Sequence, residues 1–202
     1  GIMLKVVSEV AEAKIYQTRI FGKTLLVKAR ERKAYRIEQL DVKLRSTRTK
    51  KEARIMQIAY RQGANVPKVV AYGAFEIYME KLDGMLLRDM KNAKQSIFVK
   101  CGEELAKLHK AGVVHGDFTP ANIIVSKEKV FVIDFGLAEQ APSLEERAID
   151  VLLFKRSVTP KQFEAFLMGY KKFEKSGEVI ERLKEIEKRG RYQERTIANV
   201  NV

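Results

Sequence analysis

Three polar side chains of this sequence stand at spacings that suit phosphate chemistry. Asp117 is followed five positions later by Asn122, and Asp134 ends a short apolar run. Carboxylate and amide oxygens are ligands that Mg²⁺ prefers, and a carboxylate can orient or accept the proton of an attacking hydroxyl. Phosphoryl transfer from ATP depends mainly on such positioning and charge neutralisation. The pattern therefore predicts ATP as the cofactor, Asp117 as the catalytic residue, and Asn122 and Asp134 as ligands of Mg²⁺, with Mn²⁺ as an alternative.

The residues between Asn122 and Asp134 predict a β-hairpin. Two short runs rich in β-branched residues, 123–125 and 130–133, are joined by the polar segment 126–129. Such alternation of apolar runs and turn residues is typical of two paired strands. A hairpin would bring Asn122 and Asp134 to the same end. The alternative is a buried hairpin whose flanking turn residues happen to be polar.

The motif around these residues carries a family resemblance. His115 begins the pattern HxDxxxxN, which is followed by an IDFG sequence, and the combination resembles the catalytic core of the protein-kinase-like superfamily. Typical protein kinases have Arg and Lys where this chain has Gly116 and Thr119. Aminoglycoside and choline kinases share the HGD start, but more often have His at the position of Thr119 and lack the DFG glycine. The chain is most similar to the small atypical kinases of the RIO type and, closer still, to the kinase/ATPase subunit of the KEOPS complex.

The resemblance implies roles for four further residues. Lys28 lies at the end of an apolar strand and matches the lysine that holds the α- and β-phosphates, although an edge-strand lysine is the alternative interpretation. Glu52 matches the acid that pairs with this lysine. His115 is expected to support the catalytic loop by hydrogen bonding, and Asp150 to anchor the same loop from a buried helix.

The N-terminal part of the sequence predicts an antiparallel sheet. Runs typical of strands cover residues 5–7, 13–16, 24–28, 68–72 and 76–80. The loop Ser8–Ala13 lies where an ordinary kinase has its glycine-rich loop, yet it contains no glycine, so its backbone should approach phosphates less closely. Its last four residues resemble the GAEA-like element of the KEOPS kinases and are expected to bind ATP: Val10, Ala11, Glu12 and Ala13.

The end of the last of these strands resembles the hinge between two kinase lobes. Backbone groups of Glu80 and Leu82 are candidates to hydrogen-bond adenine, and Met79 is expected to line the back of the adenine pocket.

The basic segment 30–54 predicts the long helix of the N-lobe. Asp41 could cap a long helix, or Thr49 and Glu52 could form a capping box for a shorter one. If Glu52 pairs with Lys28, it turns inward and is not part of a cap. The basic residues form either a solvated helix face or an anion-binding surface.

The C-terminal part predicts helices that pack into a core. Apolar residues follow helical spacing within 97–112, 163–173 and 179–186. Asp150 lies only 16 positions beyond Asp134, which leaves no room for a long activation segment or for a platform that holds a peptide. The tail 188–195 is basic and ends in a polar segment that is expected to be mobile. The tail resembles the RGR tail of the KEOPS kinases, in which Arg189 and Arg191 would add positive charge near the nucleotide or on RNA.

Composition limits the class of protein. The chain has 202 residues, of which 46% are hydrophobic and 32% charged, an ordinary globular balance. A net charge of +13 attracts polyanions. A single cysteine, Cys101, excludes an intramolecular disulfide and indicates a reducing cytoplasm. No apolar run approaches the roughly 18 residues of a membrane-spanning helix, so no membrane association is expected.

These observations predict an α+β protein with a minimal bilobal protein-kinase-like fold in one domain, with an N-lobe over about residues 3–80 and a mainly helical C-lobe over about residues 81–202. The resemblance implies an Mg²⁺-dependent ATPase or serine/threonine kinase in the KEOPS complex, which makes the threonylcarbamoyl modification of adenosine in tRNA. Its partners would be the ASKHA-fold transferase subunit, other KEOPS subunits and tRNA, but not DNA. Two alternatives stay open: a freestanding small-molecule kinase, and an inactive kinase-like RNA-binding scaffold.

Overall fold

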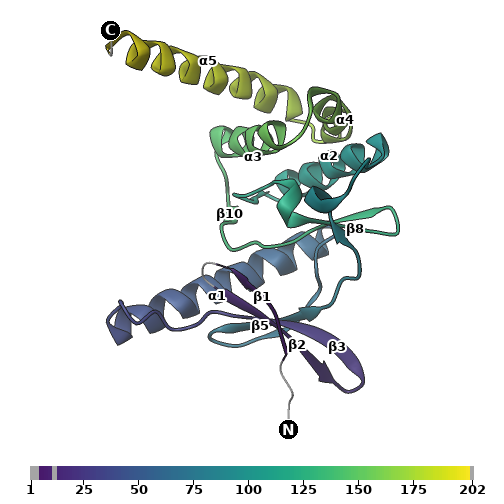
Figure 1. The fold of residues 1–202 in the computed structure, drawn as a ribbon, viewed down its shortest axis with the longest axis vertical. Helices are drawn as coiled ribbons and strands as arrows, with labels where there is room; N and C mark the ends of the chain where they lie inside the picture. Colours follow the sequence, from purple (N-terminus) through teal and green to yellow (C-terminus); the bar gives the residue numbers. More distant parts are fainter. Residues whose placement is uncertain (1–4, 11–12, 201–202) are drawn as a thin grey trace.

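The chain folds into two lobes that meet at a cleft (Figure 1). The computed structural model describes residues 5–10 and 13–200. The N-lobe holds a five-stranded antiparallel sheet in the order β1-β2-β3-β5-β4, with helix α1 packed against β4 and β5. The bounds of these elements are β1 Lys5–Val10, β2 Ala13–Ile20, β3 Lys23–Ala29, α1 Glu38–Arg61, β4 Val69–Tyr72 and β5 Glu76–Glu80.

The C-lobe is mainly helical and carries two small sheets. Helices α2 and α4 pack against each other, as do α3 and α5, and α5 lies at the end of the molecule farthest from the N-lobe sheet (Figure 1). The helices are α2 Gln95–Lys110, α3 Leu144–Ser157, α4 Pro160–Tyr170 and α5 Ser176–Val200. The sheets are β6-β8-β9 and β10-β7, built from β6 Met85–Leu86, β7 Val113–Val114, β8 Ile123–Ser126, β9 Lys129–Val132 and β10 Glu139–Gln140. The predicted α+β bilobal fold is confirmed.

The hairpin predicted between Asn122 and Asp134 is present. Strands β8 and β9 are antiparallel, with Ile123 opposite Val132. Lys127 and Glu128 form the turn with φ angles of 48° and 64°, the left-handed pair that a two-residue hairpin turn requires. Beyond the strand ends, the Ile133 amide donates to the Asn122 carbonyl over 2.9 Å. The hairpin therefore holds Asn122 beside Ile133 and Asp134.

Helix α1 begins earlier than either predicted cap. Its N-cap is Ile37, which has no side-chain capping bond. Asp41 lies in the first turn and accepts a hydrogen bond from the Lys33 amide at 3.0 Å. Thr49 lies in the helix interior, so the predicted capping box of Thr49 and Glu52 is wrong. The Lys33 amide, in the turn that follows β3, donates to Asp41 in the first turn of the helix. The sequence pattern alone does not reveal this contact.

One further expectation about local structure is wrong, and the tail extends the last helix. Residues 8–10, expected in a loop, belong to β1, because pairing with β2 continues until Val10 stands opposite Ala13. The basic tail 188–195 belongs to α5, which extends to Val200. The tail is rich in Glu, Lys and Arg, which are strong helix formers and continue the helix without any need for a core contact. No helix in the described part of the chain is both long and apolar enough to cross a membrane.

Candidate active site

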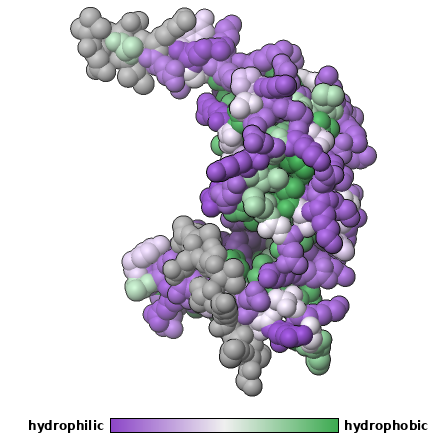
Figure 2. Space-filling model, turned by 45° about the vertical axis from the view of Figure 1, so that its right-hand side comes forward, coloured by the Kyte–Doolittle hydropathy of each residue, from purple (hydrophilic) through white to green (hydrophobic). Residues whose placement is uncertain are grey.

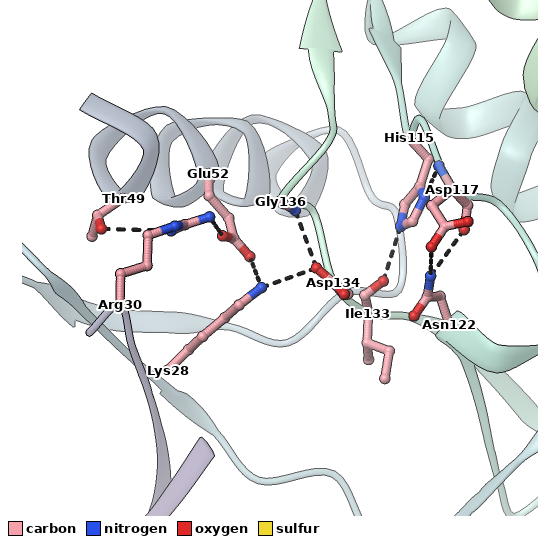
Figure 3. A network of polar contacts seen from close by, with 10 residues as sticks. All are labelled: Lys28, Arg30, Thr49, Glu52, His115, Asp117, Asn122, Ile133, Asp134 and Gly136. Carbon is pink, nitrogen blue, oxygen red and sulfur yellow. Dashed lines mark hydrogen bonds and ion pairs between the residues drawn. The ribbon is translucent and has the colours of Figure 1, made fainter. Parts of the chain in front are cut away.

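A buried ion-pair network joins the two lobes (Figure 3). Lys28 near the end of β3 lies 2.6 Å from Glu52 of α1 and 2.9 Å from Asp134 of the C-lobe, measured from Nζ to the carboxylate oxygens. The Lys28 and Glu52 side chains are buried, whereas that of Asp134 is 39% exposed. Held in this way, the Lys28 ammonium group needs only a small movement to contact a phosphate in the cleft.

Asp134 is held ionised and in an unusual backbone conformation. Burial opposes its ionisation, but the charge and hydrogen bond of Lys28, with the Gly136 amide, outweigh this effect and keep the pKa of Asp134 below its ordinary value. Its φ of 59° is in the left-handed region, where a non-glycine residue is strained and is often found at functional sites. Within the described part of the chain, the contacts of Lys28 and Gly136 use the Oδ1 atom, which leaves Oδ2 available to bind a cation.

Asp117 and Asn122 form the second half of the site. The Asn122 amide nitrogen donates to the Asp117 carbonyl and to its Oδ2 atom, both at 2.9 Å. Both bonds use the nitrogen of the carboxamide, which turns the Asn122 oxygen away from Asp117 and makes it a possible metal ligand. The short helical turn Pro120–Asn122 fixes this geometry.

The catalytic loop is anchored by Asp150 of α3. The buried Asp150 carboxylate accepts the amides of His115 at 2.8 Å and Gly116 at 2.9 Å, and contacts His109 Nε2 at 3.0 Å. His115 donates through Nε2 to the Ile133 carbonyl at 2.9 Å and accepts the Asp117 amide through Nδ1 at 3.1 Å. His115 therefore links the loop that carries Asp117 to the strand end that carries Asp134, in the tautomer with its proton on Nε2.

The structure explains why glycine stands at position 116. Gly116 has φ of 86°, and a Cβ atom there would lie 2.4 Å from the Leu137 carbonyl oxygen. After Leu137 the chain pairs with β7 through β10 and enters α3 at Leu144. The short segment after Asp134 therefore packs directly against the catalytic loop, in the space that a side chain at position 116 would occupy.

Both predicted metal ligands and most of the predicted nucleotide residues line one cleft of about 450 Å³ between the lobes. Figure 2 shows the hollow side of the molecule, with hydrophobic residues gathered above the hollow. The predicted residues among those that line the cleft are Lys28, Glu52, Met79, Glu80, Leu82, Asp117, Asn122 and Asp134. The Glu80 amide donates to the Lys68 carbonyl at 3.0 Å, so of its two backbone groups the carbonyl is the candidate for adenine.

Several residues of the cleft were missed by sequence reasoning. Leu26 and Lys28 share one face of β3, and Ile15 stands opposite Lys28 on β2. The two-residue period of a strand could have pointed to Leu26, since it places Leu26 and Lys28 side by side. Ile15 and Arg88 gave no such signal, because they reach the cleft through long-range packing.

Other predicted site residues lie elsewhere. Ala13 is buried but is not among the described residues that line the cleft. Ala11 and Glu12 lie outside the described residues, as does the side chain of Val10. Arg189 on α5 contacts Glu145 of α3, and neither Arg189 nor Arg191 lines the cleft. The predicted charge of the tail near the nucleotide therefore has no counterpart in this conformation.

Known proteins with similar sequences belong to a family of kinases. The RIO domain family matches residues 8–157. The KEOPS complex subunit Bud32 of Pyrococcus abyssi is 37% identical, over 96% of this chain and 98% of the relative. This chain belongs to the RIO-domain family. A probable serine/threonine-protein kinase BUD32 homolog of Archaeoglobus fulgidus is 39% identical, over 92% of this chain and 94% of the relative.

Longer relatives and solved structures extend the comparison. A probable bifunctional tRNA threonylcarbamoyladenosine biosynthesis protein of Methanosarcina barkeri is 38% identical over 85% of this chain, which covers 32% of that protein. The Rio2 kinase of Chaetomium thermophilum, solved as an ADP/Mg²⁺-phosphoaspartate complex, superimposes with a TM-score of 0.65 at 17% identity, over 95% of this chain and 71% of the kinase. At this identity the likeness shows the fold, which is that of a kinase.

Proposed function

We propose that the cleft binds ATP with Mg²⁺ and transfers or hydrolyses its terminal phosphoryl group. The observation that carries this proposal is the convergence of Lys28, Asp117, Asn122 and Asp134 on one cleft. Lys28 would bind the phosphates, while the backbone of Glu80 and Leu82 would bind adenine beside Met79. The neighbouring Glu52 keeps the Lys28 ammonium aimed into the cleft.

The residues present fit a magnesium ion that is shared with the nucleotide. No group of three or more acidic, histidine or cysteine side chains in the described part of the chain could hold a metal ion alone. Mg²⁺ in nucleotide sites commonly uses one or two protein oxygens and completes its shell with phosphate oxygens and water. The Asn122 carboxamide oxygen and Asp134 Oδ2 would supply these protein oxygens, and Mn²⁺ could use the same atoms. The bound cation would neutralise charge on the phosphates during transfer.

Asp117 would orient the acceptor. Its Oδ2 atom is held by Asn122, which leaves Oδ1 to accept a proton or a hydrogen bond from water or from a serine hydroxyl. ATP hydrolysis and protein phosphorylation therefore use the same groups. The segment between Asp134 and α3 is short and leaves little chain to build a platform for a peptide, which favours a partner-supplied acceptor or water.

We further propose that the chain works as a KEOPS subunit in tRNA threonylcarbamoyladenosine modification in the cytoplasm. Two of the relatives described above carry KEOPS or tRNA threonylcarbamoyladenosine in their names. In the bifunctional relative the matching segment is about a third of a longer chain, which supports a function coupled to a second protein. The ASKHA-fold transferase subunit is the partner we propose, and the charge of +13 supports tRNA as the polyanion.

The test is ATP turnover by the purified chain with and without the transferase partner and tRNA. We expect turnover to rise with both and to disappear in Asp134→Ala, while Asp83→Ala, which changes an exposed carboxylate outside the cleft, behaves like the wild type. Rapid turnover on a small alcohol by the isolated chain would instead indicate a small-molecule kinase. Full support of tRNA modification by Asp117→Ala and Asp134→Ala would indicate an inactive scaffold.

A further inference from the structure

A second cation shares Glu52 with Lys28. Arg30 lies just beyond β3, and its side chain is 5% exposed. Its NH2 atom lies 2.7 Å from Glu52 Oε2, on the opposite carboxylate oxygen from the one that Lys28 contacts (Figure 3). The NH1 atom reaches the Thr49 hydroxyl at 3.5 Å, one helical turn before Glu52. The guanidinium therefore contacts two successive turns of α1.

The ion pair is the main compensation for burying this guanidinium. Its third nitrogen, Nε, is buried with no hydrogen-bond partner among the described residues, and a buried charge is costly unless it is paired. Lys28 has two carboxylate partners, Glu52 and Asp134. When a nucleotide phosphate draws Lys28 toward the cleft, Arg30 would still neutralise Glu52 and keep it turned inward.

The backbone of Arg30 is fixed independently of its side chain. Its amide donates to the Phe75 carbonyl at 2.9 Å, and its carbonyl accepts from Arg45 NH1 at 3.2 Å. Arg45 also pairs with the buried Asp41 at 2.6 Å, and its guanidinium lies 4.0 Å from the centre of the Phe75 ring. The first half of α1 and the sheet are thus joined at the base of Arg30, while its side chain holds the middle of the helix.

We propose that Arg30 is a positioning residue that holds α1 and Glu52 in the catalytic arrangement whether or not nucleotide is bound. In ordinary protein kinases the corresponding ion pair depends on the position of this helix, which the activation segment controls. Here the segment after Asp134 is short. The contacts of Arg30 with Thr49 and Glu52 would hold the helix in place of an activation segment. The inference rests on the proposed function, because positioning is measured through ATP turnover.

The experiment compares Arg30→Met with Arg32→Met in steady-state ATP turnover. Arg32 is exposed and lies two residues farther along the chain, so its change is the matched control. We expect Arg30→Met to lower kcat by about 10- to 100-fold, as small misplacements of catalytic groups do, with a smaller change in the KM for ATP. Arg32→Met should keep wild-type values. Arg30→Lys, which can replace one contact but not the fork, should fall between the two and covers the case in which Arg30→Met does not fold.

A double-mutant comparison separates this role from general stabilisation. If Arg30 acts through Glu52, Arg30→Met should reduce turnover far less in a Glu52→Gln background than in the wild type. Equal losses in both backgrounds, or wild-type kcat in Arg30→Met, would overturn the inference. Asp134→Asn is measured beside these variants. If Asp134→Asn abolishes turnover but Arg30→Met keeps wild-type turnover, only the role of Arg30 is rejected. Undiminished turnover in Asp134→Asn rejects the proposed function and this inference together.

Discussion

Replacing Gly116 with alanine tests how the catalytic loop and the short segment after Asp134 fit together. The substitution places a Cβ atom 2.4 Å from the Leu137 carbonyl oxygen at a φ of 86°. The left-handed conformation costs an alanine about 1–2 kcal/mol. Separating the two atoms to at least about 3.0 Å needs a shift of roughly 0.6 Å, and overpacking of this kind costs about 1–3 kcal/mol. The expected loss of unfolding free energy is therefore about 2–5 kcal/mol.

Gly112 supplies the matched control. Its φ is 74°, and a Cβ atom there would have no heavy atom within 4 Å. Gly112→Ala should lose only the conformational cost of about 1–2 kcal/mol and keep its ATP turnover. Gly116→Ala should also lower kcat by about 10- to 100-fold, because Asp117 is the next residue and moves with the loop.

Urea unfolding and ATP turnover of the two variants measure these effects. Equal stability losses in Gly112→Ala and Gly116→Ala would show that the Leu137 contact adds nothing. Wild-type turnover in Gly116→Ala would show that the position of this loop does not control the chemistry.

The remaining predictions concern the buried anchor of the catalytic loop. The His115 and Gly116 amides bond to different oxygens of Asp150, so the NH2 group of Asp150→Asn must face one of the two amides. The substitution should therefore lower the unfolding free energy by about 3 kcal/mol and strongly reduce ATP turnover. A loss no larger than that of the exposed Asp83→Asn in urea unfolding would contradict this. Burial lowers the pKa of His109 despite the opposing effect of Asp150. As the pH falls, His109 is protonated in the unfolded chain at a higher pH than in the folded protein. The free energy of unfolding should therefore fall as the pH drops below about 6.5, by up to about 1.4 kcal/mol per pH unit. His109→Gln should abolish this part of the slope in urea unfolding between pH 7.5 and 5.5, and an unchanged slope would reject the assignment.

Local sequence was sufficient for the hairpin and for the residues at its ends. The β-branched runs and the polar turn define two paired strands, and their pairing alone brings Asn122 next to Ile133 and Asp134. The inward turn of Glu52 required the family resemblance, because nothing within α1 distinguishes it from a surface acid. Its predicted contact with Lys28 is present at 2.6 Å.

Long-range contacts account for what could not be predicted. The basic residue Arg30 was grouped with a solvated or anion-binding face, yet it is buried on Glu52. The first turn of α1 is held by a hydrogen bond from the Lys33 amide to Asp41. The need for glycine at position 116 depends on Leu137, which reaches it only in the folded chain.

The most direct test of the central claim is the Mg²⁺ dependence of ATP affinity in Asp134→Asn, measured by calorimetric titration beside the wild type. If Asp134 binds the cation that accompanies the nucleotide, the wild type should bind ATP more tightly with Mg²⁺ than with a chelator, and Asp134→Asn should lose most of that gain. We expect the loss to be at least about tenfold, or about 1.4 kcal/mol. Equal Mg²⁺-dependent affinity in the two proteins would contradict the assignment of this cleft to phosphoryl transfer.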